Sequence, residues 1–170
     1  MGVNSVSNIG PSISYVDKDS EIYNVLTSTG VTLQNEIDML KLARDEMDMV
    51  SIGLAFTKED SLAIVEGARP HIFCYHAGTT KGGLTGYDNG STIADTAAES
   101  EDVYAAVRKI DPNVILVGHG AAMETPEDAQ YMLDNPTGHG FWTGSSTERL
   151  PIERAVTEAA NEFTALKFKK

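Results

Sequence analysis

Residues 72–83 read Ile-Phe-Cys-Tyr-His-Ala-Gly-Thr-Thr-Lys-Gly-Gly, an apolar run followed directly by a polar, glycine-rich segment. Unbroken apolar runs of this kind are typical of strands in parallel sheets, where both faces are covered. The polar segment begins where the strand ends, and α/β proteins bind their ligands at the carboxyl ends of parallel strands. We therefore interpret this stretch as one strand–loop–helix unit whose working groups lie on the loop.

Four more runs have the same character along the chain. The five predicted strands are Ser12–Val16, Met49–Leu54, His71–His76, Val114–Gly118 and Gly140–Thr143. Apolar residues at helical spacing follow or separate them, namely Leu33, Ile37, Leu40 and Met47 in one segment and Ile152, Ala155, Val156, Ala159, Phe163 and Leu166 in the last. Strands alternating with helices predict a parallel sheet with right-handed crossovers.

Helix boundaries are marked at several points. Thr57 and Thr125 each stand three residues before a carboxylate, a spacing typical of a helix N-cap, and proline follows Thr125 at the first helical position. Gly67 and Asp111-Pro112 are predicted stops for the helices that precede them. The long connection from residue 77 to about residue 97 is rich in glycine and threonine, and loops of that length are often functional.

Five units leave two alternatives for the architecture. An eight-stranded barrel normally needs about 250 residues, so these 170 residues cannot close one. Either the first three barrel units lie elsewhere, or the chain forms an open five-stranded sheet of the flavodoxin type. A half-barrel would leave unpaired strand edges and an apolar face, so we expect it to pair with itself or to require the missing N-terminal segment.

Composition narrows the function classes. The net charge of −12 and the pI near 4.6 disfavour nucleic acid and anionic membranes as partners, because both carry negative charge. No apolar run approaches the roughly 20 residues of a membrane span, and no secretory signal is visible at the start. Cys74 is the only cysteine, so no internal disulfide can form and a cytoplasmic location is expected.

Polar clusters follow the ends of separate strands, and we expect them to line one common pocket at the carboxyl end of the sheet. His76 and His119 each end an apolar run, and an imidazole there can exchange protons or polarise a carbonyl near neutral pH. The alternative is that each histidine fixes a loop through backbone hydrogen bonds. His71 and His139 precede their strands, so they are expected to be structural residues at the opposite rim.

The loops offer anion-binding groups. Residues 78–83 combine bare N–H groups, hydroxyls and one ammonium, but they do not form a Walker A motif, and a mobile lid is the alternative. Gly144, Ser145 and Ser146 follow the last strand, where barrels often hold a phosphate, although the serines could simply cap a helix. Arg149 could pair with a carboxylate or phosphate, or with a neighbouring glutamate.

Other chemistry has weaker support. Cys74 is more simply a small buried hydrophobe than a nucleophile. Asp17 and Glu124 could join the two histidines as metal ligands, but no tight ligand spacing supports a site. No metal ligand is therefore assigned, and a divalent metal such as Mg²⁺ remains a candidate cofactor.

Three motifs carry a resemblance to a known family. They are Cys-Tyr-His-Ala-Gly-Thr-Thr-Lys-Gly-Gly at 74–83, Val-Gly-His-Gly at 117–120 and Gly-Ser-Ser-Thr-Glu-Arg-Leu-Pro-Ile-Glu at 144–153. Through them the chain resembles the phosphoenolpyruvate hydrolase-like TIM-barrel family over nearly its whole length. The resemblance implies that residues 1–170 are one partial barrel domain comprising about strands four to eight of a phosphoenolpyruvate/pyruvate-binding barrel.

The resemblance also implies site residues. His76, His119 and Glu148 would be catalytic, and the substrate or phosphate would be bound by Thr79, Gly82, Gly83, Gly120, Gly144, Ser145, Ser146 and Arg149. One departure is that Gly120-Ala121-Ala122 replaces the family's Gly-Gly-Pro. The leading hypothesis is a hydrolase or lyase acting on a small phosphorylated or carboxylated keto or enol acid. The second is a non-catalytic barrel fragment that serves protein association.

Overall fold

The computed structural model describes residues 4–8, 12–84, 86, 90–135 and 138–167. Its strands form one five-stranded parallel sheet in the order β1-β2-β3-β4-β5, so each strand pairs with its neighbours in sequence. The strands are β1 Ser5–Ser7, β2 Val50–Ala55, β3 Ile72–His76, β4 Ile115–His119 and β5 Gly140–Phe141. The prediction of an α/β fold with a parallel sheet is confirmed.

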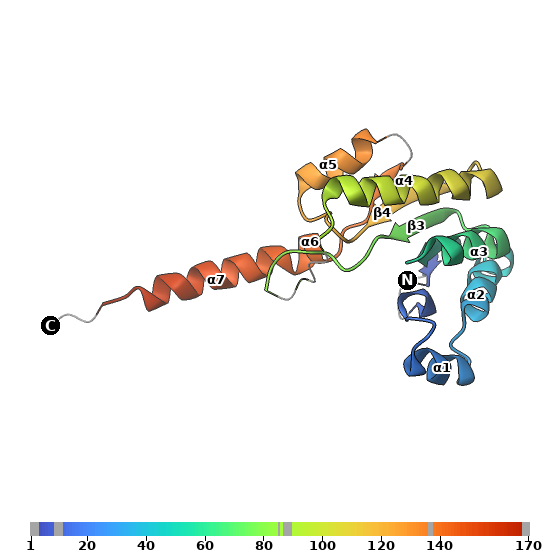
Figure 1. The fold of residues 1–170 in the computed structure, drawn as a ribbon, viewed down its shortest axis with the longest axis horizontal. Helices are drawn as coiled ribbons and strands as arrows, with labels where there is room; N and C mark the ends of the chain where they lie inside the picture. Colours follow the sequence, from blue (N-terminus) through green and yellow to red (C-terminus); the bar gives the residue numbers. More distant parts are fainter. Residues whose placement is uncertain (1–3, 9–11, 85, 87–89, 136–137, 168–170) are drawn as a thin grey trace.

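Helices follow the strands, as the alternating pattern predicted (Figure 1). They are the 3-10 helix η1 Ile13–Tyr15 and the α-helices α1 Glu21–Ser28, α2 Leu33–Glu46, α3 Lys58–Ala68, α4 Ile93–Ile110, α5 Pro126–Asp134, α6 Ser145–Glu148 and α7 Leu150–Thr164. Among the described residues, every helix is too short or too polar to span a lipid bilayer.

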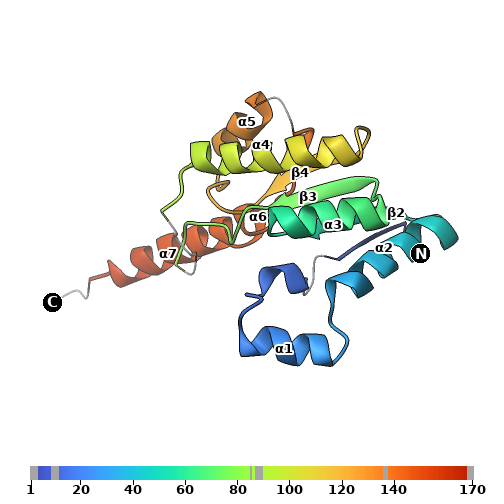
Figure 2. The ribbon, with the colours of Figure 1, turned by 45° about the vertical axis from the view of Figure 1, so that its right-hand side comes forward.

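The main core lies on one face of the sheet. Strand residues that alternate toward this face, such as Phe73, Tyr75 and Leu116, pack against the buried apolar residues of α2, α3 and α4. Figure 2 shows α3 and α4 lying beside β3 and β4. Gly67 lies inside α3, and its lack of a side chain lets α3 pack closely on α2, since a Cβ there would meet the Ile37 side chain at 2.7 Å. The predicted stop at Gly67 is therefore wrong, and the helix ends one residue later.

The other face of the sheet distinguishes the two proposed architectures. It presents Val50 and Ile115, which are 41% and 47% exposed, so apolar strand residues remain accessible there. A flavodoxin-like sheet has the strand order 2-1-3-4-5 and helices on both faces. The sequential order and the one-sided helix layer are instead those of successive units in a barrel, here as an open sheet.

The first predicted strand, Ser12–Val16, is wrong. The strand lies earlier, at β1, and residues 13–15 form the 3-10 helix that follows it. Ser12 caps this helix by accepting from the Ser14 N–H, and the Glu36 carboxylate accepts from the Ser12 hydroxyl and the Ile13 N–H. These side-chain acceptors favour a turn in a segment whose β-branched residues suggested a strand. The segment therefore belongs to the loop at the carboxyl end of β1.

Both predicted N-caps are confirmed. The Thr57 hydroxyl accepts from the Asp60 N–H, and Thr125 forms a complete capping box with Asp128 at the start of α5. The predicted stop at Asp111 is also confirmed, since α4 ends at Ile110.

Helix α7 forms as predicted, but its apolar stripe is not buried. Leu150 is its only buried residue, whereas Ile152, Val156 and Phe163 are 63%, 63% and 75% exposed. Figure 1 shows the helix extending away from the sheet toward the C-terminus. The stripe is therefore accessible to a partner.

Candidate active site at the carboxyl ends of the strands

Two histidines meet at the carboxyl ends of adjacent strands. His76 ends β3 and His119 ends β4, and the sheet register pairs them directly. Their rings lie edge to face with centroids 4.3 Å apart. Both line a pocket of about 280 Å³ together with Ser145, Thr79 and other residues of the neighbouring loops. Parallel strands thus bring together side chains that are far apart in sequence.

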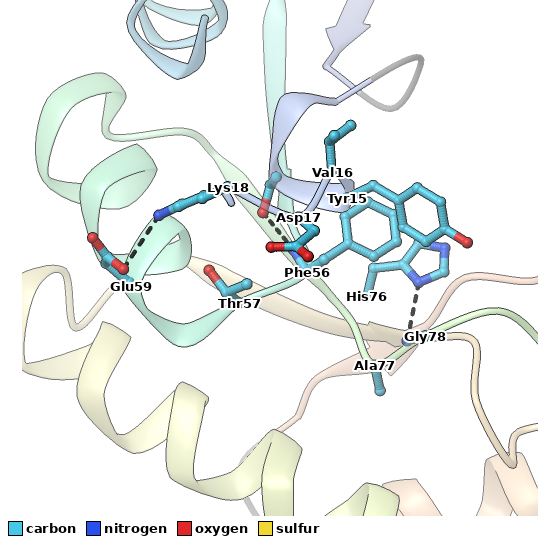
Figure 3. Close-up of a pocket in the computed structure, with 11 residues that line it drawn as sticks. Tyr15, Val16, Asp17, Lys18, Phe56, Thr57, Glu59, His76, Ala77 and Gly78 are labelled. Carbon is cyan, nitrogen blue, oxygen red and sulfur yellow. Dashed lines mark hydrogen bonds and ion pairs between the residues drawn. The ribbon is translucent and has the colours of Figure 1, made fainter. Parts of the chain in front are cut away.

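Aromatic rings form one wall of this pocket. Phe56, just after β2, stacks on His76 with a centroid distance of 4.1 Å, and Tyr15 of η1 lies against Phe56 at 4.8 Å. The Tyr15 hydroxyl is 3.3 Å from the Thr79 hydroxyl, so it links the first loop to the loop after β3. Figure 3 shows the three rings side by side.

A second cavity of about 530 Å³ adjoins the first along these aromatic residues and His76. Asp17 and Glu59 line it, and Figure 3 shows Glu59 paired with Lys18. The Asp17 carboxylate accepts from the Asp19 N–H, and Glu59 forms an ion pair with Lys18. Lys18 also pairs with the buried Asp60, which raises the lysine pKa above its usual value. Two carboxylates, Asp17 and Glu59, line this cavity beside one ammonium, Lys18, so its charged groups carry a net negative charge.

Backbone groups orient both histidine rings. The Gly78 N–H donates to Nδ1 of His76 at 3.3 Å, and Nδ1 of His119 lies 2.6 Å from the carbonyl oxygen of Trp142. Burial lowers the pKa of His76 to about 3, and the neighbouring His119 adds to the effect. His76 is therefore neutral throughout the physiological pH range.

Two glycines predicted to bind substrate leave room for these rings. Gly120 has φ +84°, and a Cβ there would collide with the Gly78 carbonyl oxygen and lie within 3.0 Å of the His76 ring. A Cβ at Gly144 would lie 3.1 Å from Cε1 of His119. Neither position tolerates a side chain without displacing a histidine or its loop, whatever role the glycine backbone has in binding.

Arg149 holds the glycine-rich loop against α7. Its guanidinium donates to the carbonyl oxygens of Thr80 and Gly82 at 3.2 and 2.9 Å, and it forms an ion pair with Glu153. Gly83, with φ +72°, lies so close to Arg149 and Glu153 that a Cβ would collide with both side chains. The predicted binding residues Gly82, Gly83 and Arg149 therefore contact one another at the N-terminus of α7.

The remaining predicted site residues are separated from the histidine pair. Ser146 lines a different cavity of about 250 Å³, with Met123, Glu124 and Phe141. Glu148, the predicted third catalytic residue, ends the short helix α6, is exposed and lines none of the cavities described here. Its assignment stays a prediction from the resemblance.

The donor set does not fit Mg²⁺. This ion prefers carboxylate oxygens, whereas the pocket at the histidine pair offers imidazoles and hydroxyls. In the described part of the chain, no three His, Cys, Asp or Glu side chains gather as a metal site. Glu124 in particular lies against Gly82. The polar side chains at the histidine pair therefore suit hydrogen bonding and proton transfer better than they suit Mg²⁺.

The other titratable candidates have structural roles. Nδ1 of His71 accepts from the Ser51 N–H at 3.1 Å, and Nδ1 of His139 accepts from the Leu116 N–H at 2.8 Å. These bonds tie the amino-terminal ends of neighbouring strands, as expected for the opposite rim. Cys74 is fully buried, and burial raises its thiol pKa to about 12, which agrees with its interpretation as a core residue.

Sequence reasoning missed the aromatic wall and the orienting carbonyl. Tyr15 and Trp142 lie in segments predicted as strands, although β5 ends at Phe141, and Phe56 follows β2 without any motif. A usable signal for Phe56 was its position one residue after the apolar run of β2, equivalent to the positions that follow the other strands. The carbonyl of Trp142 has no sequence signal, because every residue has one.

Fold and site together define a class of protein. Successive parallel βα units with polar groups gathered at the carboxyl ends of the strands are characteristic of TIM-barrel proteins. The family model described as phosphoenolpyruvate hydrolase-like matches residues 1–166. The chain belongs to the phosphoenolpyruvate hydrolase-like family.

Two curated relatives come from Solanum lycopersicum: the ToMV susceptible protein tm-1 and the ToMV resistance protein Tm-1. Each is 30% identical to this chain over 149 residues, which is 87% of this chain. The match covers 20% of each relative, so the chain spans about one fifth of their length.

Proposed function

We propose that this chain provides the acid–base half of a barrel active site, acting as a hydrolase or lyase on a small keto or enol acid. The observation that carries the proposal is the register-paired contact of His76 and His119 beside the hydroxyls of Thr79 and Ser145. Imidazoles placed so closely at a strand-end pocket can move a proton and stabilise an enolate oxygen. The name of the family model supports the same substrate class.

The pocket lining favours a carboxylated over a phosphorylated acid. Among the described residues, its lining holds no lysine or arginine, and Arg149 is engaged by the loop. Neutral donors, namely hydroxyls and imidazole N–H groups, can satisfy a monoanionic carboxylate, whereas a phosphate at neutral pH carries more charge than such donors balance. We propose pyruvate-like monocarboxylates first, and the more highly charged oxaloacetate and phosphoenolpyruvate second.

Titration calorimetry with oxaloacetate, pyruvate and phosphoenolpyruvate tests this proposal. We expect binding of the carboxylates, weakened several-fold by Ser145→Ala because one hydrogen-bonding hydroxyl is lost. Ser146→Ala is the matched control, since the adjacent serine lines a different cavity. Absence of binding of all three acids, or equal losses in both variants, would contradict the proposal.

A second candidate is a non-catalytic module for protein association. The exposed apolar stripe of α7 and the open sheet edges favour it. The relatives' names refer to ToMV resistance and susceptibility, which is also consistent with a role in recognition. We further propose that the chain assembles with itself or with a segment that supplies the remaining barrel units, and that it works in the cytoplasm.

A further inference from the structure

The backbone partner of Nδ1 is a donor at His76 and an acceptor at His119. This difference determines which ring nitrogen of each histidine carries the proton. The Gly78 N–H can only donate, so Nδ1 of His76 must accept and carries a lone pair. A neutral imidazole has one N–H, which places the proton of His76 on Nε2. The Trp142 carbonyl oxygen can only accept, so Nδ1 of His119 must carry a proton and Nε2 of a neutral His119 carries the lone pair.

The surrounding loops make these partners rigid. The Ala77 N–H donates to the His119 carbonyl, the Ala121 N–H donates to the Gly78 carbonyl at 2.8 Å, and the Lys81 N–H donates to the Ala121 carbonyl at 2.9 Å. These bonds continue the pairing of β3 and β4 past the end of the sheet and hold the Gly78 N–H at the His76 ring. On the other side, the Trp142 N–H donates to the Gly118 carbonyl at 2.8 Å, which fixes the carbonyl that orients His119.

We infer that the pair is built asymmetrically: His119 is the general base through Nε2, and His76 is a neutral hydrogen-bond donor through Nε2–H. The inference rests on the proposed function, in which both rings reach the same bound acid. Phe56 stacks on His76, and the backbone partner of Nδ1 in each ring opposes a flip that would exchange its two nitrogens. A strand-end histidine pair of this kind would suit proton abstraction next to a carbonyl group.

The chemical step balances without a further reactant. The C–H bond next to the carbonyl breaks, and its proton moves to the lone pair of His119 Nε2. The electron pair of that bond forms the carbon–carbon double bond of the enolate, while the carbonyl π electrons move to oxygen. The hydrogen bond from His76 Nε2–H stabilises that oxygen, and the reverse step returns the proton to carbon.

Nitrogen-15 NMR of the full chain labelled at histidine tests the proton positions without any substrate. We expect a protonated Nε2 and an unprotonated Nδ1 for His76, and the reverse for His119. His76→Gln and His119→Gln spectra assign the signals. The same tautomer at both residues, or rapid exchange between tautomers, would overturn the inference even if the chain binds keto acids.

Exchange of the pyruvate methyl protons with deuterated water, followed by proton NMR, tests the roles. His119→Asn keeps a donor near the Trp142 carbonyl but removes the base, so we expect a loss of about 100-fold or more. His76→Gln can still present an N–H near the position of Nε2, whereas His76→Asn cannot, so the Asn variant should be about 10-fold slower than the Gln variant.

Equal losses in the two His76 variants, or retained exchange in His119→Asn, would contradict the assigned roles. The wild type could show the expected tautomers and yet fail to exchange the methyl protons of pyruvate. That result would contradict the proposed reaction and the roles of the two histidines in it, but it would agree with the proposed proton positions. A proton NMR spectrum of each variant, compared with that of the wild type, shows whether the variant is folded. Only a folded variant with slower exchange supports a catalytic role for the replaced histidine.

Discussion

The Arg149 guanidinium donates to the Gly82 carbonyl oxygen 2.9 Å away, although 67 residues separate them in the chain. This hydrogen bond links the loop after β3 to the N-terminus of α7. Replacing Arg149 with Ala removes the donor and leaves two carbonyls and Glu153 without it, so we expect a loss of about 1–3 kcal/mol in the free energy of unfolding. Urea unfolding followed by circular dichroism measures the loss.

Arg149→Lys should recover only part of that stability, because an ammonium lacks the planar fork that reaches both carbonyls. Arg154→Ala, on the same helix and exposed, is the matched control and should change stability by less than about 0.5 kcal/mol. If the Arg149→Ala and Arg154→Ala proteins unfold at the same urea concentration, the contact does not stabilise the chain.

Gly83→Ala should be more damaging than Gly90→Ala. Both glycines have similar positive φ values, +72° and +81°, so both substitutions incur about 1 kcal/mol of backbone strain. At Gly83 the new methyl also collides with Glu153 and Arg149, whereas at Gly90 no described atom lies within 4 Å of it. We expect the melting temperature to fall several degrees further for Gly83→Ala, and a reversed order would refute the close packing of this loop.

Acid should destabilise the chain partly through His76. The folded-state pKa of His76 is lowered from 6.5 to about 3, so the unfolded state binds the proton first as the pH falls. The neutral ring's contribution is complete above about pH 6.5 and is lost progressively from there toward pH 3. The slope from this one group is at most about 1.4 kcal/mol per pH unit.

His76→Gln removes this titration, so its unfolding free energy should vary less with pH between 6.5 and 3 than that of the wild type. The comparison uses urea unfolding at several pH values, with His71→Gln as a control at the opposite rim. Parallel pH curves for wild type and His76→Gln would mean that the buried ring is not held neutral.

Self-association should depend on the apolar stripe of α7. Changing Val156 and Phe163 together to Ser removes two large exposed apolar side chains from that stripe, so we expect the mass measured by light scattering after size exclusion to fall toward 18.3 kDa. Glu158→Ala on the same helix should leave the wild-type assembly unchanged. A wild-type chain that elutes as a stable 18.3 kDa monomer would contradict self-association.

The sequence was informative where one local signal acts alone. Apolar runs located four of the five strands, and the threonine caps at Thr57 and Thr125 marked two helix starts. The segment 12–16 failed because its β-branched residues suggest a strand, while the acceptors that bend it are Ser12 and the distant Glu36. Propensity cannot reveal a hydrogen bond that depends on the finished fold.

The candidate active site was also predictable only in part, because some of its contacts depend on the finished fold. Strand-end position predicted that His76 and His119 would meet, because parallel strands place their ends together. It could not distinguish Ser145 from Ser146, which face different cavities from adjacent positions. Nor could it show that Arg149 would be engaged by the backbone of a loop 67 residues earlier.

The sequential strand order has a consequence for how such a chain can change in length. Each strand pairs only with the strand before it and the strand after it, so removing or adding a terminal unit moves the sheet edge and opens no gap inside. In an interleaved sheet, the loss of one segment would separate strands that remain. Insertions, truncations and gene fusions at either boundary of this sheet therefore preserve all of the remaining strand pairs, including the one that joins β3 to β4.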